Sequence, residues 1–266
     1  MRVGDLSDKV AIVTGASQGI GKGISIAFGE AGASVVCAAR NVEKLAETRA
    51  GVEAAGGKAV IAECDVRKLE DVNACVDRAI EEFGQIDIVT NNAQTIQYVF
   101  LTDASDQTMV DTLESGPLAS YRFIQAAYPH LKGRGGGVIV NVGSPAQHLP
   151  VTARYACYNA AKFGIQGLTR AASDEWSQDG IYSFMLYPMA ETAMVLGMKA
   201  REPERYANIV KDFPKGRMGD PLEDIGRPLV RLVTNAKHFS GKTIRINSLG
   251  VGEITETIAD EPFTLP

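Results

Sequence analysis

Tyr158 and Lys162 are four residues apart in a stretch whose apolar spacing predicts a helix over Arg154–Gln178. Residues four apart lie on one face of a helix, so the phenol and the ammonium group would be neighbours. A free tyrosine has a pKa of about 10, and a nearby positive charge lowers that pKa by stabilising the phenolate. Such a pair could give a proton to a carbonyl oxygen or take one from an alcohol. On its own, a tyrosine and a lysine at this spacing more often form a surface pair on a helix.

Ser144 precedes Tyr158 by 14 residues and follows closely on the apolar run Gly137–Val142. A serine hydroxyl at the end of a strand could donate a hydrogen bond to a substrate oxygen and stabilise the charge that develops there. The order serine, tyrosine, lysine therefore favours acid–base chemistry at a carbonyl group over a surface pair.

Three glycines, Gly15, Gly19 and Gly21, occur where the apolar run Val10–Thr14 passes into the helical stretch Gly19–Glu30. A glycine lets the chain turn tightly and come close to a ligand, and the start of a helix offers free N–H groups to a phosphate. The spacing TGxxxGxG differs from the GxGxxG dinucleotide fingerprint. An ordinary glycine-rich turn between a strand and a helix is the alternative interpretation.

Apolar runs and amphipathic stretches alternate along the chain. The runs predict strands over Val10–Thr14, Ser34–Ala39, Lys58–Glu63, Ile86–Asn91, Gly137–Val142, Ile181–Tyr187 and Thr243–Asn247. The amphipathic stretches predict helices over Gly19–Glu30, Val42–Ala55, Leu69–Phe83, Met109–Leu131, Arg154–Gln178 and Pro221–Thr234. This alternation indicates an α/β fold, a doubly wound parallel sheet of seven strands with helices on both faces. We expect a single domain over residues 1–266, with irregular segments at Met189–Asp220 and in the tail, about 251–266.

The 266 residues include 27 Lys+Arg and 32 Asp+Glu, which gives a net charge of −5. This balance argues against a protein that binds nucleic acid through a basic surface. No apolar run approaches about 18 residues, so we expect no membrane span, and the N-terminal residues lack the apolar core of a secretion signal. Four cysteines without a CxxC pair indicate reduced thiols in a cytoplasmic protein. Three scattered histidines give no metal-binding pattern.

Four motifs, in this order, resemble those of the short-chain dehydrogenase/reductase family. They are the TGxxxGxG turn, Asn91-Asn92-Ala93, Ser144, and the run from Tyr158 to Lys162. The resemblance covers roughly residues 7–250 and implies a Rossmann fold, a bound nicotinamide dinucleotide, and hydride transfer to or from a carbonyl or an alcohol. It also implies that Tyr158 is the general acid/base, that Ser144 donates to the substrate oxygen, and that Lys162 hydrogen-bonds the nicotinamide ribose.

The resemblance further implies a set of cofactor-binding residues: Gly15, Ser17, Gln18, Gly19, Ile20, Arg40, Asp65, Val66, Asn92, Tyr158, Lys162, Pro188 and Thr192. At the tip of the second strand, Ala39 stands where an NAD-selective site has an acidic side chain. Arg40 follows it and can pair with a phosphate, which favours NADP(H) and leaves NAD(H) open. Arg40 could instead be a solvated residue at a helix start. Asp65 could contact adenine, cap the helix Leu69–Phe83, or do both.

Two departures from the family pattern concern the acid–base centre. Gln94 stands where many members have glycine; it could contact substrate or cofactor, or bond only to backbone. Gly116 stands where active members often carry an asparagine that helps to hold a water linking the lysine to solvent. Gly116 and Pro117 should kink the helix Met109–Leu131. We expect a water in the space left by Gly116 to take over that relay, with Ser115 assisting.

The candidate substrate residues are Gln94, Gln147, His148, Met189 and Met194. Met189 replaces a glycine usual in the family, and the offset of Thr192 from Pro188 is one residue shorter than usual. By resemblance, residues 189–220 form a substrate lid. The methionines could equally be core residues, and His148 a surface histidine.

The sequence thus predicts an NADP(H)-dependent oxidoreductase that reduces a ketone or aldehyde, reversibly. The alternatives are an NAD(H)-dependent alcohol dehydrogenase of the same family and a catalytically impaired dinucleotide-binding subunit. Beyond a small-molecule substrate, the resemblance implies a homo-oligomer, a tetramer or dimer, formed through Met109–Leu131 and Arg154–Gln178. The outward faces of these helices are expected to carry Tyr121, Phe123, Tyr128 and Phe163.

Overall fold

Short runs of β-branched and small apolar residues form the strands of one central sheet. The computed structural model describes residues 4–148, 153–211, 213 and 215–254. The strands are β1 (Val10–Thr14), β2 (Ser34–Ala39), β3 (Lys58–Glu63), β4 (Ile88–Asn91), β5 (Gly137–Val142), β6 (Ile181–Pro188), β7 (Thr243–Asn247) and β8 (Gly250–Ile254). Their order across the sheet is β3-β2-β1-β4-β5-β6-β7-β8. All pairings are parallel except that of β7 with β8.

The eighth strand corrects the expected count of seven. The chain reverses after β7 and returns antiparallel to it, so that Asn247 pairs with Gly250. The Asn247 side chain accepts a hydrogen bond from Leu249 N (2.8 Å), and Gly250 adopts φ +117°. A turn closed by an asparagine side chain and followed by a glycine is a compact way to form a hairpin. The start of the predicted tail is therefore a strand, and residues 255–266 lie outside the described residues.

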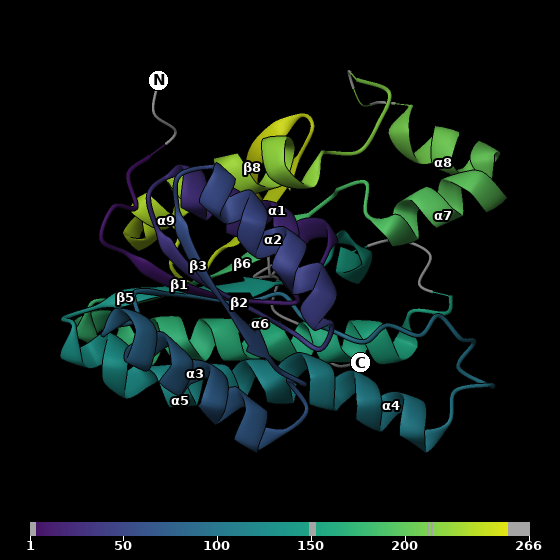
Figure 1. Ribbon diagram of the computed structural model, residues 1–266. Helices are drawn as coiled ribbons and strands as arrows, with labels where there is room; N and C mark the ends of the chain where they lie inside the picture. The colour runs from purple at the N-terminus through teal and green to yellow at the C-terminus, as the bar shows by residue number, and fades with distance from the viewer. Residues whose placement is uncertain (1–3, 149–152, 212, 214, 255–266) are drawn as a thin grey trace, which may run out of the picture.

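Helices cover both faces of the sheet (Figure 1). One face carries α1 (Gly19–Glu30), α2 (Val42–Ala54) and α9 (Arg227–Thr234), and the other carries α3 (Leu69–Phe83), α5 (Ala119–Gly133) and α6 (Ala156–Trp176). Side chains alternate between the two faces along each strand. Val13 and Val35 enter the core beneath α1, whereas Ile12 and Val36 enter the core beneath α3. The α/β architecture is thus the one expected, with two hydrophobic layers about a single sheet.

The helix expected over Met109–Leu131 is interrupted. It consists of α4 (Asp106–Leu113), a π-helical turn at Glu114–Leu118, and α5. Pro117 lies inside the π-helical turn and has no N–H to continue the α-helical ladder, so the chain accommodates it with a wider turn. The α-helical hydrogen bonding is therefore interrupted at Gly116 and Pro117, where we expected a kink.

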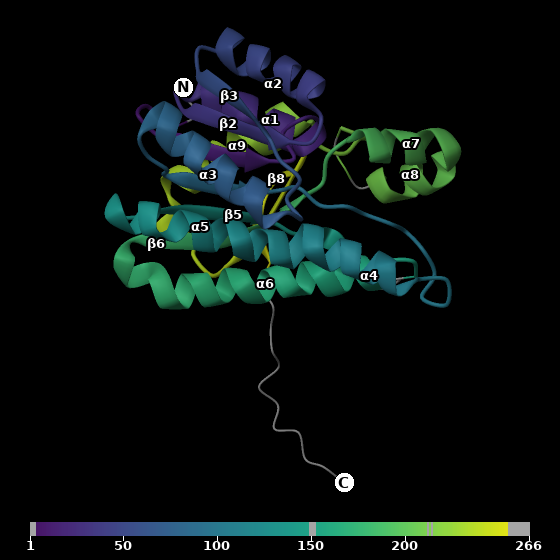
Figure 2. The same cartoon turned by 60° about the horizontal axis from the view of Figure 1, so that its bottom comes forward.

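The segment from Met189 to Asp220 is more regular than expected. It contains α7 (Ala193–Arg201) and α8 (Pro203–Val210), which project together from the body of the molecule (Figure 2). Tyr206, Val210 and Met218 form a small core of their own there. Met198 packs against that core, whereas Met194 is 46% exposed.

The aromatic residues expected on the outer faces of the long helices differ in burial. Phe123 is a core residue, fully enclosed between α5 and the sheet, which corrects its expected outward position. Tyr128 stacks on Trp176 with ring centroids 4.5 Å apart. Tyr121 and Phe163 are the two that face outward, with 45% and 47% of their surface exposed.

The four cysteines are buried and free, as the sequence predicts for reduced thiols. Within the ranges that the structure describes, no helix is long and apolar enough to cross a membrane. The same residues include no group of three or more side chains arranged to hold a metal ion.

Gly23 tests the packing of α1. A Cβ atom at this position would lie 2.3 Å from Pro221 O, in the turn that precedes α9. We expect Gly23→Ala to lower the free energy of unfolding by about 1–3 kcal/mol, as overpacking of a tight contact does. Thermal unfolding followed by circular dichroism measures it. Gly133→Ala is the matched control, because Gly133 is also helical and nothing lies within 4 Å of its Cβ position. Equal melting temperatures for the two variants would show that α1 and this turn are not in close contact.

Candidate active site

The predicted site residues follow the carboxyl ends of neighbouring parallel strands. The glycine turn follows β1, Asn92 follows β4, Ser144 follows β5, and Pro188 ends β6. Chain connections leave β1 and β4 in opposite directions across the sheet, since β2 lies beside β1 and β5 beside β4. Ligands of open α/β sheets bind in the crevice at such a switch point.

The glycine turn has the backbone geometry that a phosphate site needs. Gly15 and Gly19 adopt φ angles of +66° and +54°, which residues other than glycine rarely adopt. A Cβ on Gly21 would lie 2.3 Å from Gly15 O, so the turn could not close with a larger residue there. The residue before α1, Gln18, makes no side-chain capping bond, which leaves the first N–H groups of the helix available to an anion.

Thr14 fastens this turn to β4 and was not singled out from the sequence. Its hydroxyl accepts hydrogen bonds from Asn92 N (2.9 Å) and Ala93 N (3.0 Å) and donates to Thr90 O. The Asn92 side chain donates back to Thr14 O (2.8 Å). Because Thr14 and Asn92 belong to two different motifs, their contact shows that the motifs form one structure. The signal in the sequence was a hydroxyl at the last position of a buried strand.

Arg40 and Asp65 lie at the ends of β2 and β3. Arg40 is exposed and forms no hydrogen bond or ion pair with the described residues. Asp65 accepts hydrogen bonds from the Arg67 side chain (Nη2 at 2.7 Å), and these lower the pKa of Asp65 to about 2, with a smaller contribution from the charge of Arg40. The Asp65 carboxylate does not cap α3, because Lys68 is the cap position and makes no side-chain bond there. The capping role considered for Asp65 is therefore wrong.

The remaining predicted cofactor residues lie around this crevice. Ser17 and Ile20 are half-buried in the glycine turn and the first turn of α1, and the Val66 side chain is buried in the core beneath α3. Thr192 caps α7, accepting from Val195 N at 3.4 Å. Its Cγ2 lies 3.4 Å from the Cβ position of Gly19, so the start of α7 faces the glycine turn.

Ser144, Tyr158 and Lys162 lie together beside the end of β5. The Ser144 hydroxyl is close enough to the Tyr158 phenol to act as a hydrogen-bond partner that lowers its pKa, and Lys162 Nζ donates to Val142 O at 2.6 Å. The Tyr158 and Lys162 side chains are buried. The Lys162 Nζ atom lies 5.5 Å from the centroid of the Tyr158 ring. The geometry thus places a phenol, a hydroxyl and an amine within one small volume.

Burial sets the pKa values of this group. It raises the pKa of Tyr158 to about 12, although the hydrogen bond from Ser144 acts in the opposite direction. It lowers the pKa of Lys162 to about 7, because no carboxylate accompanies the buried ammonium. The expected lowering of the tyrosine pKa by the lysine charge is therefore not found in this structure. Desolvation penalises the charged form of both groups and outweighs their mutual attraction.

A buried chain of hydrogen bonds fixes α6 relative to the sheet. Asn91 donates to Asn141 (2.8 Å), and Asn141 donates to Thr169 (3.0 Å), which joins β4, β5 and α6. Gln147 supports the Ser144 loop from within, because its Oε1 accepts from Ser144 N (3.1 Å) and its Nε2 donates to Gln166. Gln147 is buried in these contacts, and its expected role beside the substrate stays a prediction.

The other candidate substrate residues, His148, Met189 and Met194, make different kinds of contact. His148 is exposed and contacts Tyr187, with Nε2 3.2 Å from the tyrosine oxygen. The Met189 backbone bonds Ile246 O through its N–H and Gly219 N through its carbonyl, which ties β6 to two later segments. Met194 Sδ accepts a hydrogen bond from Tyr98 OH at 3.3 Å.

Aromatic residues that were not predicted flank Tyr158 on its outer side. The Tyr98 ring lies 4.9 Å from the Tyr155 ring and 6.2 Å from the Tyr158 ring, centroid to centroid. Tyr98, Tyr155 and Met194 form an apolar cluster beside the acid–base group. Arg205, from α8, lies close enough to Tyr155 for the two side chains to interact. This cluster was not predicted because Tyr98, after β4, and Arg205, after β6, are far apart in the chain.

Gln94 lies against Gly116. Its Nε2 would be 2.9 Å from a Cβ at residue 116, so its amide takes the space in which we expected a water. The Ser115 hydroxyl is also engaged, since it donates to Asp111 O (2.7 Å) and accepts from Thr95 N (3.0 Å). The Gln94 amide therefore occupies the place beside Gly116 where we expected the water, and the Ser115 hydroxyl is already bonded to backbone. A relay through a water near these residues stays a prediction.

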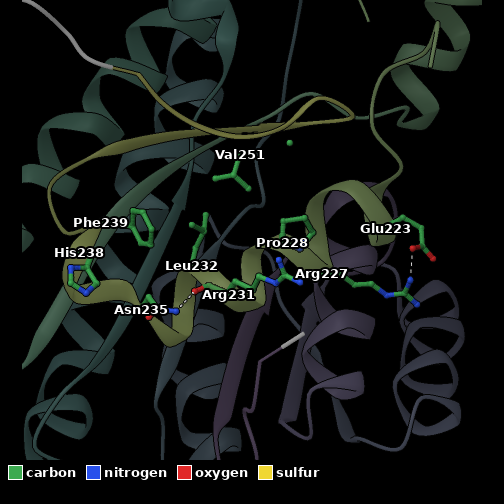
Figure 3. A pocket seen from close by; sticks show the side chains of 10 residues that line it. Glu223, Arg227, Pro228, Arg231, Leu232, Asn235, His238, Phe239 and Val251 are labelled. Carbon is green, nitrogen blue, oxygen red and sulfur yellow. Dashed lines mark hydrogen bonds and ion pairs between the residues drawn. The ribbon is translucent and has the colours of Figure 1, made fainter. Parts of the chain in front are cut away.

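A separate hollow of about 720 Å³ lies between α9 and the start of β8 (Figure 3). Arg227, Arg231, Leu232 and Val251 are among the residues that line it. Arg227 is paired there with Glu223 and with Glu30 of α1. None of the predicted catalytic or cofactor-binding residues lines this hollow, so it is not part of the candidate active site.

The chain is similar to known proteins over most of its length. A family model described as short chain dehydrogenase matches residues 9–203. The chain is 35% identical over 260 residues to a 12alpha-hydroxysteroid dehydrogenase from Clostridium sp., covering 94% of this chain and 99% of that enzyme. A solved 7 alpha-hydroxysteroid dehydrogenase, complexed with NADH and 7-oxo glycochenodeoxycholic acid, has a TM-score of 0.86 and 27% identity, over 96% of this chain and 98% of that one. L-Sorbose reductase from Gluconobacter frateurii, complexed with NADPH and L-sorbose, has a TM-score of 0.83 and 26% identity, over 92% and 97%.

Lys162→Met tests the buried amine. The lowered pKa means that, between about pH 7 and the usual lysine pKa, unfolded wild-type protein binds more protons than folded protein, so the stability of the wild type rises with pH. The variant lacks this term. The melting temperature of the variant minus that of the wild type should therefore increase as the pH falls from about 10 to about 6.5. Thermal scans at several pH values measure the difference. A difference independent of pH would show that Lys162 keeps an ordinary pKa.

Proposed function

The chain belongs to the short-chain dehydrogenase/reductase family of NAD(P)-dependent oxidoreductases, and from this premise we propose that it is an NADP(H)-dependent reductase of a ketone or aldehyde, reversible toward the alcohol. The observation that carries the proposal is the contact of Ser144 with Tyr158 one helical turn from Lys162, at the end of β5. This arrangement can bind a carbonyl oxygen and protonate it. A nicotinamide dinucleotide, when bound, supplies the hydride.

Tyr158 is the general acid for reduction. Its raised pKa keeps the phenol protonated near neutral pH, which is the form that gives a proton to a carbonyl oxygen. Ser144 donates a hydrogen bond to the same oxygen and stabilises its developing charge. Lys162 keeps N–H groups beyond the one bonded to Val142 O, and these would bind the nicotinamide ribose. Oxidation of the alcohol requires the phenolate, so the rate of oxidation should rise with pH.

The cofactor preference rests on the end of β2. Ala39 offers no carboxylate to repel a 2′-phosphate, and Arg40 beside it is exposed and unpaired among the described residues. A guanidinium binds a phosphate through two parallel hydrogen bonds. The glycine turn at the start of α1 would hold the pyrophosphate, and the Gly19–Thr192 contact puts α7 close to that site. The same turn suits NAD(H), which leaves Arg40 as the discriminating residue.

The substrate class follows from the apolar cluster of Tyr98, Tyr155 and Met194. Two aromatic rings and a thioether next to the acid–base group favour a large, flat, apolar substrate over a small polyol. Two relatives are hydroxysteroid dehydrogenases, and one of them was solved with a polycyclic ketone. We therefore propose a cyclic ketone, with residues 189–220 as the lid that bears α7 and α8.

We also propose that the protein is a homo-oligomer in the cytoplasm. Tyr121 of α5 and Phe163 of α6 face outward, together with Leu118, which is 37% exposed. Exposed apolar side chains on two adjacent helices suit burial against a second copy. Four buried free thiols suit a reducing compartment.

The first test follows the oxidation of NADPH and NADH by reduced-nicotinamide absorbance over a panel of aliphatic, monocyclic and polycyclic ketones. We expect turnover with NADPH, rising in kcat/KM toward the larger ring ketones. Arg40→Ala should lower kcat/KM for NADPH by about tenfold to a hundredfold, the value of a charge-assisted hydrogen bond, with little change for NADH. Arg49→Ala, an exposed arginine on α2, is the matched control. Equal loss with both cofactors would exclude Arg40 as the phosphate ligand.

Tyr158→Phe should reduce turnover by at least about a hundredfold while cofactor binding, measured by fluorescence titration, stays unchanged.

In the wild type, alcohol oxidation should rise with pH from about 7 to 10, because only the phenolate accepts a proton, whereas carbonyl reduction should not rise. Tight cofactor binding without turnover of any ketone by the wild type would support the impaired-subunit alternative. Oxidation that does not change over this pH range would exclude Tyr158 as the base.

A further inference from the structure

Gln94 is half-buried, but the two polar atoms of its amide are enclosed. Both its Nε2 and its Oε1 are enclosed, and neither has a hydrogen-bond partner among the described residues. A buried donor or acceptor left without a partner is unfavourable, so such groups in folded proteins nearly always bond to something. An amide with both a free donor and a free acceptor is suited to hold a water molecule.

The neighbouring segments hold Gln94 firmly in this place. Residue 92 is bonded to Thr14 on one side. On the other side Thr95 N donates to the Ser115 hydroxyl, which is itself bonded to Asp111 O within the interrupted helix. The chain on both sides of Gln94 is therefore fixed, so the side chain is positioned by the backbone and does not depend on its own hydrogen bonds.

Gly116 makes room for the amide. A Cβ at residue 116 would lie 2.9 Å from Gln94 Nε2 and 3.4 Å from the Cβ of Ala161. The Gln94 amide and Ala161, which precedes Lys162 on α6, are thus both close to one point. A side chain at residue 116 and the amide of Gln94 cannot occupy this place together.

The reaction requires that a proton return from solvent to this group of residues. Each reduction moves one proton from Tyr158 to the substrate oxygen and leaves a phenolate, which must recover a proton from solvent. Tyr158 and Lys162 are only 8% and 3% exposed, so solvent does not reach them freely. Burial without a carboxylate partner lowers the pKa of Lys162 to about 7, which lets the amine take up and release a proton near neutral pH.

We infer that Gln94 is a positioning residue for proton return: its amide, in the space left by Gly116, holds the water through which Lys162 exchanges a proton with solvent. One proton enters from solvent for each proton that Tyr158 gives to the substrate, so the residues return to their starting state. The amide does not titrate, and its donor and acceptor can orient the water in either direction, which suits a reversible reaction. This inference rests on the proposed function, because it assigns a step to the same group of residues.

The test is a cycle of variants in the full-length protein. Gln94→Ala should lower kcat by about tenfold, leave the Kd for NADPH unchanged, and increase the solvent deuterium isotope effect on kcat, because proton return becomes slower. Gly116→Ala should act similarly, because it displaces the end of a flexible side chain without disturbing the fold. The double variant should be no worse than either single variant, since both changes remove one function. Thermal scans check that all variants are folded.

Rescue separates proton return from mere packing. Gly116→Asn alone should impair turnover, because its side chain collides with Gln94. In the Gln94→Ala background the same change should restore kcat to within about threefold of the wild type, since an amide again occupies this space. Gln97→Ala, an exposed glutamine in the same segment, is the matched control.

Full kcat and an unchanged isotope effect in Gln94→Ala would overturn the inference, as would a Gly116→Asn variant more active than the wild type. Failure of rescue with a stable, cofactor-binding double variant would also overturn it. Failure of the proposed function has a different signature, because the wild type itself would then bind NADPH and turn over no ketone.

Discussion

The hydrogen bond from Lys162 Nζ to Val142 O is the interaction on which the site depends. It places an ionisable amine in the interior, at the point where β5 ends and α6 passes beneath it. A buried amine is tolerated only if its donors are satisfied, because an unsatisfied charged group in the interior is strongly unfavourable. The Val142 carbonyl accepts a hydrogen bond from one N–H but carries no negative charge to stabilise the ammonium. The amine therefore loses its proton easily. The protein therefore keeps at this position a group that is ready to exchange a proton, at some loss of stability.

The rest of the scaffold preserves that bond. The chain Asn91, Asn141, Thr169 ties α6 to two strands, and Thr14 with Asn92 ties the glycine turn to the same strand end. These contacts are buried or partly buried and link segments far apart in the sequence. Because each strand is fixed to its neighbours by the parallel ladder, a small set of side-chain bonds is enough to bring the cofactor turn and the acid–base group to one edge of the sheet.

Elements with a local cause were predicted well from the sequence. Strands β1, β2, β3, β5 and β7 and helices α1 and α3 have the predicted bounds, because short apolar runs, glycines and amphipathic spacing are local signals. The break in α-helical bonding at Pro117 was equally local. Strand β8 was missed because its partner, β7, stabilises it. Tyr98 and Arg205 were missed because their contacts join distant residues through the irregular stretches after β4 and β6.

Gln94 and Gly116 show why departures from a family pattern are better interpreted in pairs. Taken one at a time along the sequence, a glutamine in place of glycine looks like an added polar contact, and a glycine in place of asparagine looks like a lost one. In the folded chain the two positions adjoin, and the steric exclusion between a residue-116 side chain and the Gln94 amide couples them. The asparagine of other family members is absent from the interrupted helix, where this chain has Gly116. Gln94, in the segment after β4, supplies an amide at the same place. Since the surrounding backbone is fixed by Thr14 and Ser115, the functional constraint is on the presence of an amide at this place, and either segment can supply it.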